Sequence, residues 1–360
     1  MKLTKWWIIA ISLLMVAIRP VWAQENKNFE ARIVRVVEEK EIEVDGHKQT
    51  YQKLELKLTN GLNQGKIITV ENGDQPLVNV IVYEEGDRVV VLMGEDLEGK
   101  EIYTITDYVR KDGLILLVII FVALTLAVAR LKGLMSILSM GFTFGVVFIY
   151  ILPQLSLGKN PVMVATLATV IIIPISFYMA HGINQKTTVA VISSMIALGV
   201  TTGLAILFIK LGRLTGLASE EAGMLLIQRA GNFDMKGLLL SGIIIGSLGI
   251  LDDITIAQAG VVSELIKNEK KVNKIKVYEQ AMNVGRDHIS SMINTLILAY
   301  AGASMPLLLI FVDNPHPWGE IINYEFLAEE IIRTLVGSIG LILAVPITTA
   351  IAVNWIRGEK

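Results

Sequence analysis

The sequence predicts a mainly α-helical polytopic membrane bundle of about seven transmembrane helices, preceded by a small external all-β domain, OB-like or a similar barrel. Three observations support this fold class. Of the 360 residues, 53% are hydrophobic and 18% are charged, whereas soluble domains are about 45–50% apolar and about 25% charged. The apolar residues are concentrated in long runs, and ~20 such residues suffice to cross a bilayer. Residues 24–110 instead show the alternation typical of β-strands.

Residues 1–23 have the layout of a secretory signal peptide. Lys2 and Lys5 precede an apolar run, and Val21 and Ala23 stand at the −3 and −1 positions of a cleavage site. An uncleaved amino-terminal anchor is the alternative, although the apolar run is short for a membrane span. Under either interpretation, the residues that follow are exported.

Residues 24–110 are predicted to form an extracytoplasmic β domain. In TYQKLELKLTN, the apolar residues Leu54, Leu56 and Leu58 alternate with charged ones, which indicates a strand with one buried face. FEARIVRVVEE, GKIITVENG, GDRVVVLMGED and EIYTITDYV indicate further strands, separated by turn signals such as Asn72-Gly73. About five short strands in some eighty residues favour a small antiparallel barrel.

Residues 111–360 are predicted to form the transmembrane helical domain. Most connections between its spans are short. The connection 210–236 is long enough to hold an amphipathic interfacial helix, and 263–287 is expected to be a basic cytoplasmic loop. The expected spans are 113–131, 133–153, 161–180, 188–209, 237–259, 288–311 and 327–355.

The positive charges support one orientation, with the β domain outside and the carboxyl terminus inside. If the β domain is exported, the first span ends inside at Arg130 and Lys132, and the loop 263–287 and the carboxyl end also lie inside. These segments are basic, as the positive-inside rule requires. The outer connection 210–236 carries Lys and Arg too, which is a mild conflict.

Small residues and prolines predict how the spans pack. Gly242, Gly246 and Gly249 recur on one helix face, and glycines at such spacing let helices approach closely in lipid. Their simple abundance in transmembrane helices is the alternative explanation. Three prolines within spans, Pro174, Pro306 and Pro346, are expected to kink or interrupt their helices.

Asp252 and Asp253 form the centre of a candidate intramembrane polar site. A charge at the bilayer centre costs ~2.5–3.5 kcal/mol on insertion scales, so such residues indicate function. A continuous helix places Asp252, Thr255 and Gln258 at successive three-residue steps on a polar stripe. A helix broken near the preceding glycines is the alternative, and it resembles the cation sites of secondary transporters.

Arg286, Asp287 and Asn294 complete the candidate site. Asp287 and Asn294 share a helix face, and the long connection before them favours antiparallel packing of their span against the one that carries the aspartates. Arg286 could then reach Asp252 or Asp253. Either the aspartates handle an ion or proton, or such an ion pair merely fixes the packing.

Other chemistries are disfavoured by the sequence. The chain has no cysteine, no Gly-rich phosphate loop, and four histidines without metal-ligand spacing. The net charge of −2 does not favour nucleic acid as a partner. We therefore expect no enzyme activity, no cofactor and no metal.

Several stretches carry a family resemblance: ARIVRVVEE, GDRVVVL, HGINQKT, GSLGILDDITIAQAGVVSEL, NVGRDHISSMINTLILAYAGASMPLLL and GSIGLILAVPITTAIA. Over nearly its whole length, the chain resembles the YibE/F-like family of multi-pass bacterial membrane proteins. The resemblance implies that Asp253 is the family-like acidic position, that Asp252 is a local variation, and that YibE-like and YibF-like halves are joined. It also implies the cytoplasmic membrane of a bacterium, and it supplies no activity.

Two functions follow as hypotheses. The first is a transporter or permease-like protein that takes a small solute or ion into the polar site within the bilayer. The second is a non-transporting scaffold or sensor whose external β domain binds a partner in the cell envelope or membrane. An intramembrane enzyme is a weaker third hypothesis because no nucleophile and base stand together.

Overall fold

The computed structural model describes residues 28–44, 46–61, 63–75, 80–95, 99, 101–229, 231–268, 273–313 and 317–356. The predicted signal peptide, residues 1–23, lies outside these ranges. The chain divides into two compact units, residues 1–124 and 125–360.

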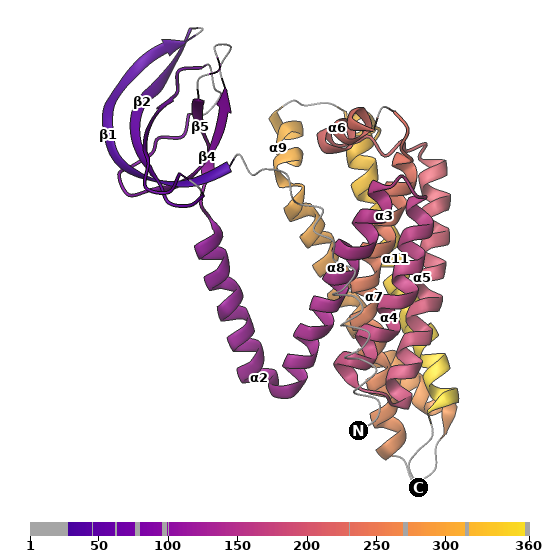
Figure 1. Cartoon of the computed structure of the whole chain (residues 1–360). Coiled ribbons are helices and arrows are strands. Elements are labelled where there is room, and N and C mark those ends of the chain that lie inside the picture. Colours follow the sequence, from indigo (N-terminus) through magenta and orange to yellow (C-terminus); the bar gives the residue numbers. More distant parts are fainter. Residues whose placement is uncertain are drawn as a thin grey trace. The chain divides into compact units, whose positions relative to one another are not determined.

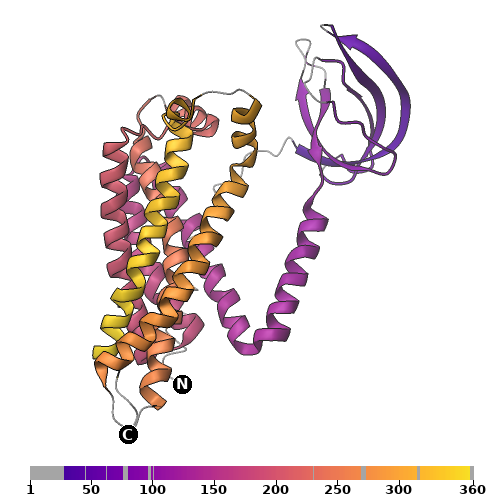
Figure 2. The ribbon, with the colours of Figure 1, turned by 180° about the vertical axis from the view of Figure 1, so that it is seen from behind.

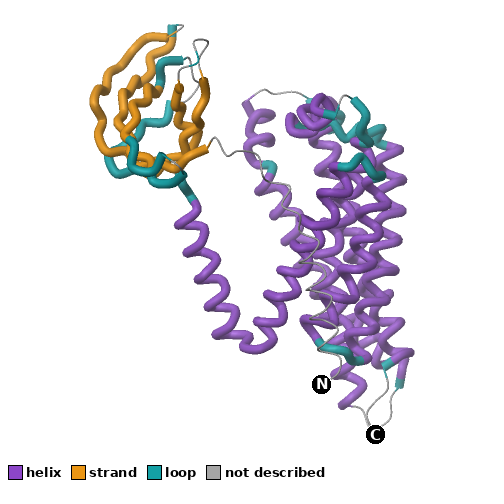
Figure 3. The backbone as a smooth tube through the Cα atoms, in the orientation of Figure 1, coloured by secondary structure: helices purple, strands orange, loops and turns teal. Residues whose placement is uncertain are grey.

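The first unit contains five antiparallel strands in the order β3-β2-β1-β4-β5. β3 also lies beside β5, where Lys66 and Glu101 form an ion pair of 2.8 Å, so the sheet is a nearly closed barrel (Figure 3). This confirms the predicted antiparallel barrel. The strands are β1 Asn28–Val44, β2 His47–Leu58, β3 Ile67–Asn72, β4 Arg88–Glu95 and β5 Glu101–Tyr108.

The interior of the barrel is filled by alternating apolar residues. Leu54, Leu56 and Leu58 are each at most 1% exposed and pack with Ile33 and Val89, which confirms the alternation expected for this strand. Irregular register within β1 bends this long strand, as bulges do in closed sheets.

One polar side chain also lies inside the barrel. Gln52 is fully buried, and its Nε2 donates to the Tyr83 carbonyl oxygen at 3.0 Å while its Oε1 accepts from the Tyr83 N–H at 2.9 Å. The segment around Tyr83 has no strand assignment, so Gln52 supplies the pairing that a neighbouring strand would otherwise give. The amide therefore fastens the connection between β3 and β4 to the sheet.

Helices make up the rest of the described chain (Figures 1 and 2). Among the described residues, five segments are long and apolar enough to cross a membrane: Lys111–Ser156, Pro161–His181, Gln185–Leu211, Met235–Lys267 and Glu325–Trp355. The predicted count of seven is not confirmed. The helices are α2 Lys111–Val146, η1 Val147–Ile151, α3 Leu152–Ser156, α4 Pro161–His181, α5 Gln185–Leu211, α6 Glu220–Gln228, α7 Met235–Asn268, α8 Lys274–Ala303, α9 Met305–Asp313, α10 Trp318–Ile321 and α11 Glu325–Trp355.

The first two predicted spans form one apolar segment of 46 residues, Lys111–Ser156. Helix resumes directly after a break at Arg130, where φ is 50° and ψ is −130°, so no separate connection divides the spans. A straight helix of this length would extend ~69 Å, more than twice the ~30 Å hydrocarbon core. The break at Arg130 coincides with the predicted boundary between the two spans.

The predicted span 288–311 is divided between two helices. α8 ends at Ala303, and α9 begins at Met305, next to Pro306, whose ring nitrogen cannot donate to a preceding turn. The expected interruption at Pro306 is therefore present, whereas α4 and α11 continue across Pro174 and Pro346. The polar residues of α8 keep this stretch from qualifying as a span by length and composition.

The two long connections contain helix, about half of 210–236 and most of 263–287. The segment 210–236 contains α6, which begins after Ser219, whose side chain accepts a hydrogen bond from the Ala222 N–H at 3.2 Å. The predicted basic loop 263–287 is replaced by the end of α7 and the start of α8, which leaves only 269–273 between them. Both helices extend because buried residues such as Ile266 and Val277 continue the packing of the bundle.

α7 packs against α4, α5, α8 and α11. Its residues Leu251, Ile254 and Val262 are each at most 1% exposed within the bundle core. α5 and α11 approach closely at one point, because a Cβ at Gly340 would lie 2.1 Å from Thr201 Oγ1. Glycine at this position is therefore required by the contact between the two helices.

Candidate functional site

A cavity of about 260 Å³ lies between α2, α4 and α7, and Asp252 and Asp253 both line it. We call it the Asp252 pocket. It contains a run of hydroxyl groups and one imidazole beside the two carboxylates. The polar residues that line it are Ser136, Ser139 and Thr143 of α2, Ser176 and His181 of α4, and Asp252 and Asp253 of α7.

The Asp252 pocket lies within the depth of the spans, close to one of their ends. Ser176 and His181 belong to the last two turns of α4, and α4 ends at His181. Asp252 stands 17 residues after Met235, the first residue of α7, which is ~26 Å along the helix. α7 continues unbroken across the two aspartates, so the alternative of a broken helix at this point is not observed.

The wall that α2 contributes is held by few contacts. Of the α2 residues, only Gly133, Ser139 and Val146 are buried. Ser139 Oγ donates to the Ser176 carbonyl oxygen at 3.1 Å, and this hydrogen bond joins α2 to α4. Two other pocket hydroxyls donate within their own helices, Thr143 to the Ser139 carbonyl oxygen at 3.2 Å and Ser176 to the Ile173 carbonyl oxygen at 3.2 Å.

Neither carboxylate of the pocket has a partner among the residues that the structure describes. No described residue forms a hydrogen bond or an ion pair with either carboxylate, and the Thr255 hydroxyl lies 3.3 Å from the backbone carbonyl oxygen of Asp252. Asp252 is half-buried and Asp253 is exposed. Two adjacent carboxylates at this depth repel each other and lack compensating charge. Such a pair can accept protons or bind a cation, and the neighbouring hydroxyl oxygens can add further ligands.

Arg286 does not pair with either aspartate in the structure. It is exposed, and its guanidinium donates to Asn283 Oδ1 on the same helix at 2.8 Å. Asp287 and Asn294 are exposed on α8 and do not line the Asp252 pocket. The predicted packing of α8 against α7 is present, but it uses Gly285, where a Cβ would lie 3.1 Å from Gln258 Nε2.

Gln258 has a place in the packing of the bundle rather than in the Asp252 pocket. It is 1% exposed, and its Nε2 donates to the Ala281 carbonyl oxygen at 2.9 Å and to Thr349 Oγ1 at 2.8 Å. One amide therefore joins α7 to both α8 and α11. Thr255 is likewise used in packing, where its hydroxyl is 2.7 Å from Ser194 Oγ on α5. The three residues of the predicted polar stripe therefore contact different surroundings. Thr255 and Gln258 bond to neighbouring helices, and of the three only Asp252 lines the Asp252 pocket.

The glycines of α7 are not points of close helix contact within this chain. A Cβ at Gly242, Gly246 or Gly249 would meet no atom within 4 Å. Gly249 lines the Asp252 pocket, and the other two glycines are exposed. These residues leave the surface of α7 open next to Asp253 instead of drawing a neighbouring helix onto it.

The hydroxyl groups of α2 were missed by the sequence reasoning, although the sequence carries a signal for them. Ser136, Ser139 and Thr143 are spaced by three and four residues, which places them on one helix face. His181 ends the span that precedes the turn at Asn184. Within the described ranges, no three His, Cys, Asp or Glu residues come together in a way that could hold a metal.

Comparison with known proteins assigns the helical part of the chain. The family model described as YibE/F-like protein matches residues 117–358, about two thirds of the 360 residues. The strands quoted for the resemblance lie before residue 117, outside this match. No curated protein and no solved structure matches the chain. The matched region carries the five apolar segments and the Asp252 pocket, and we conclude that the chain is a membrane-embedded protein that belongs to the YibE/F-like family.

Proposed function

We propose that the protein is a secondary transporter that binds a cation or a small polar solute at the Asp252 pocket. One observation carries the proposal: two carboxylates without partners line a cavity at the depth of the spans. An uncompensated charge at the bilayer centre costs ~2.5–3.5 kcal/mol on insertion scales, which is an upper bound for a pocket near one end of the spans. An occupant that neutralises the charge offsets this cost. A proton and a metal cation would compete for the same oxygen atoms, which is the chemical basis of exchange.

We also propose that the part of α2 that lines the Asp252 pocket is able to move away from the bundle. Alternating access needs one element that can separate from the rest of the bundle while the site stays fixed. The part of α2 that lines the pocket has few buried residues, and the Ser139 hydroxyl donates a hydrogen bond to α4. α7 is held from several sides and therefore supplies the fixed part. The cytoplasmic membrane, with the β unit outside and the carboxyl terminus inside, remains our proposed location.

Flux measurements on Asp253→Asn and Asp252→Asn test the proposal. The purified full-length protein is first screened by thermal shift against monovalent and divalent cations across pH. Liposomes loaded with a pH-sensitive dye are then given a gradient of protons or of the stabilising cation. We expect each Asn variant to lose at least about tenfold in flux, because a neutral amide neither takes up a proton nor balances a cation.

Glu279→Gln is the matched control. Glu279 is an exposed acid on α8, and no described residue pairs with it, so its removal changes the same charge away from the pocket. Its flux should equal that of the unmodified protein. Flux that stays unchanged in both Asp variants, with similar thermal stability, would eliminate the Asp252 pocket as the transport site.

A non-transporting scaffold or sensor is the second candidate. The β unit has its own core, and its strands lie outside the family match, so an envelope partner is an independent proposal for this unit. The strand order, with β1 between β2 and β4 and with β3 beside β5, supports an OB-like architecture. If the protein is a scaffold, deletion of residues 28–108 should abolish its function. Asp252→Asn and Asp253→Asn should in that case change only the thermal stability.

A further inference from the structure

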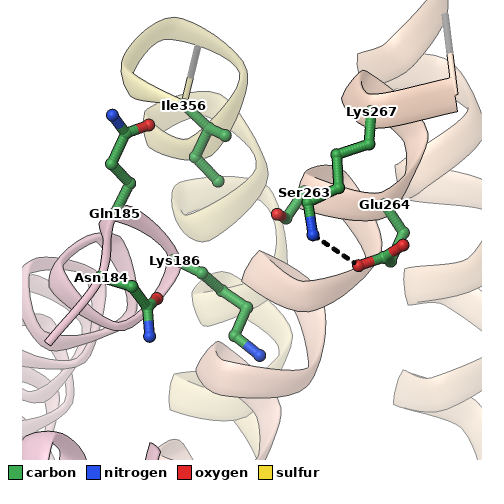
Figure 4. Close-up of a pocket in the computed structure, with 7 residues that line it drawn as sticks. All are labelled: Asn184, Gln185, Lys186, Ser263, Glu264, Lys267 and Ile356. Atoms are coloured by element: carbon green, nitrogen blue, oxygen red, sulfur yellow. Dashed lines mark hydrogen bonds and ion pairs between the residues drawn. The ribbon is translucent and has the colours of Figure 1, made fainter. Parts of the chain in front are cut away.

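A second cavity, of about 470 Å³, lies where α5 begins and where α7 and α11 end (Figure 4). It shares no residue with the Asp252 pocket. The polar side chains that line it are Asn184, Gln185, Lys186, Ser263, Glu264 and Lys267. We call it the Lys186 cavity.

Two lysines give the Lys186 cavity its charge. The Lys186 stem lies against α7, because a Cβ at Gly260 would be 3.8 Å from Lys186 Cδ, and no described residue forms an ion pair with its ammonium. The Lys267 ammonium is 3.2 Å from Glu264 Oε1. The lining therefore carries one net positive charge, with the Lys186 charge unneutralised.

Neutral donors face the same space. The cavity adjoins the amino-terminal end of α5, where Asn184 Oδ1 accepts from the Thr187 N–H at 2.9 Å and the helix dipole favours an anion. Ser263 is 9% exposed, and within the described part of the chain no group bonds to its hydroxyl. Figure 4 shows this hydroxyl directed from α7 toward the beginning of α5. The Ser263 residue is thus nine-tenths buried, and its hydroxyl, which bonds to no described protein group, can bond to a ligand in the cavity.

We propose that the Lys186 cavity binds a phosphate-bearing anion through the ammonium groups of Lys186 and Lys267 and the hydroxyl of Ser263. Phosphate oxygens accept several hydrogen bonds at once, and one net positive charge matches a singly charged phosphodiester. The turn at Asn184 follows His181, the last residue of the apolar segment Pro161–His181, so the cavity lies at the level of lipid headgroups. An anionic phospholipid and free inorganic phosphate present this same chemistry.

The test uses the full-length protein in mixed micelles with phosphatidylglycerol, with phosphatidylcholine, or with inorganic phosphate. Lipid retention is measured by native mass spectrometry, and thermal unfolding is followed in the same samples. We expect phosphatidylglycerol to be retained and to raise Tm more than phosphatidylcholine does. Lys186→Gln should weaken binding about tenfold, the value of one charge-assisted hydrogen bond. Stabilisation by inorganic phosphate, lost in the same variant, would support the site with free phosphate as its source.

Two further variants keep the outcome decisive. Lys159→Gln removes an exposed lysine from the turn before α4 and should bind like the unmodified protein. Ser263→Ala removes the buried hydroxyl with little change in volume and should weaken binding even if Lys186→Gln fails to fold. Equal retention of both lipids with no effect of inorganic phosphate, or anion binding that neither Lys186→Gln nor Ser263→Ala alters, would overturn the proposal.

Discussion

Replacement of Gly340 by alanine tests how closely α5 and α11 are packed. The added Cβ would lie 2.1 Å from Thr201 Oγ1 and 3.2 Å from both Cβ and Cγ2 of the same residue, whereas carbon atoms in contact prefer about 3.5–4.0 Å. Rotation of the threonine does not remove the overlap, because the fixed Cβ is among the atoms approached. Overpacking of this kind costs ~1–3 kcal/mol. The better helix propensity of alanine returns up to ~1 kcal/mol.

Gly203→Ala separates the cost of overpacking from the gain in helix propensity. Gly203 lies on α5, and a Cβ there would meet no atom within 4 Å, so this variant gains helix propensity without a clash. Gly340→Ala should therefore be about 1–3 kcal/mol less stable than Gly203→Ala in reversible unfolding in mixed micelles, followed by helical circular dichroism. Thr201→Ala removes Oγ1 and Cγ2 and should recover most of the loss in the double variant. Equal stability of the two glycine variants, or a loss that Thr201→Ala leaves unchanged, would refute the reasoning.

Two more predictions concern buried polar contacts. Gln258→Met keeps the side-chain length but removes the bonds to the Ala281 carbonyl oxygen and to Thr349 Oγ1, so we expect a loss of about 1–2 kcal/mol in the same unfolding assay. Little loss beyond that of Thr349→Val would contradict this assignment. In the β unit, the hydrogen bond and charge of Lys111 hold the pKa of Glu30 below its ordinary value of 4.5. The Glu30 contribution to stability is therefore present above pH 4.5 and is lost as the pH falls through the lower, folded-state pKa. Hydrogen exchange of β1 should show this pH dependence, and Glu30→Gln should abolish it.

The local structure of the chain was accessible from the sequence. The alternation around Leu56 predicted a strand with one buried face, and that face is buried. The long apolar runs predicted membrane helices because lipid requires backbone groups to be satisfied within each segment. The position of Asp252 at the depth of the spans also follows from counting residues along α7. In each case the information lies within one continuous segment.

The sequence did not predict which helices and side chains contact one another. Arg286 was expected to reach Asp252 or Asp253, and the structure places its guanidinium on Asn283 of its own helix. Periodicity identifies a face of a helix and not the element that covers it. The same limit applies to Gly246, which was expected at a helix contact and is exposed. Gln258 was assigned to an ion site for the same reason, although it joins three helices.

The filled interior of the barrel has a consequence for what the β unit can recognise. The interior is filled by leucine and valine side chains and by the amide of Gln52, which is hydrogen-bonded to Tyr83. Lipocalin-like barrels keep this space for a small molecule. A partner of this unit, as proposed above, would then have to bind to its outer wall or to its loops. The interior would not enclose a metabolite.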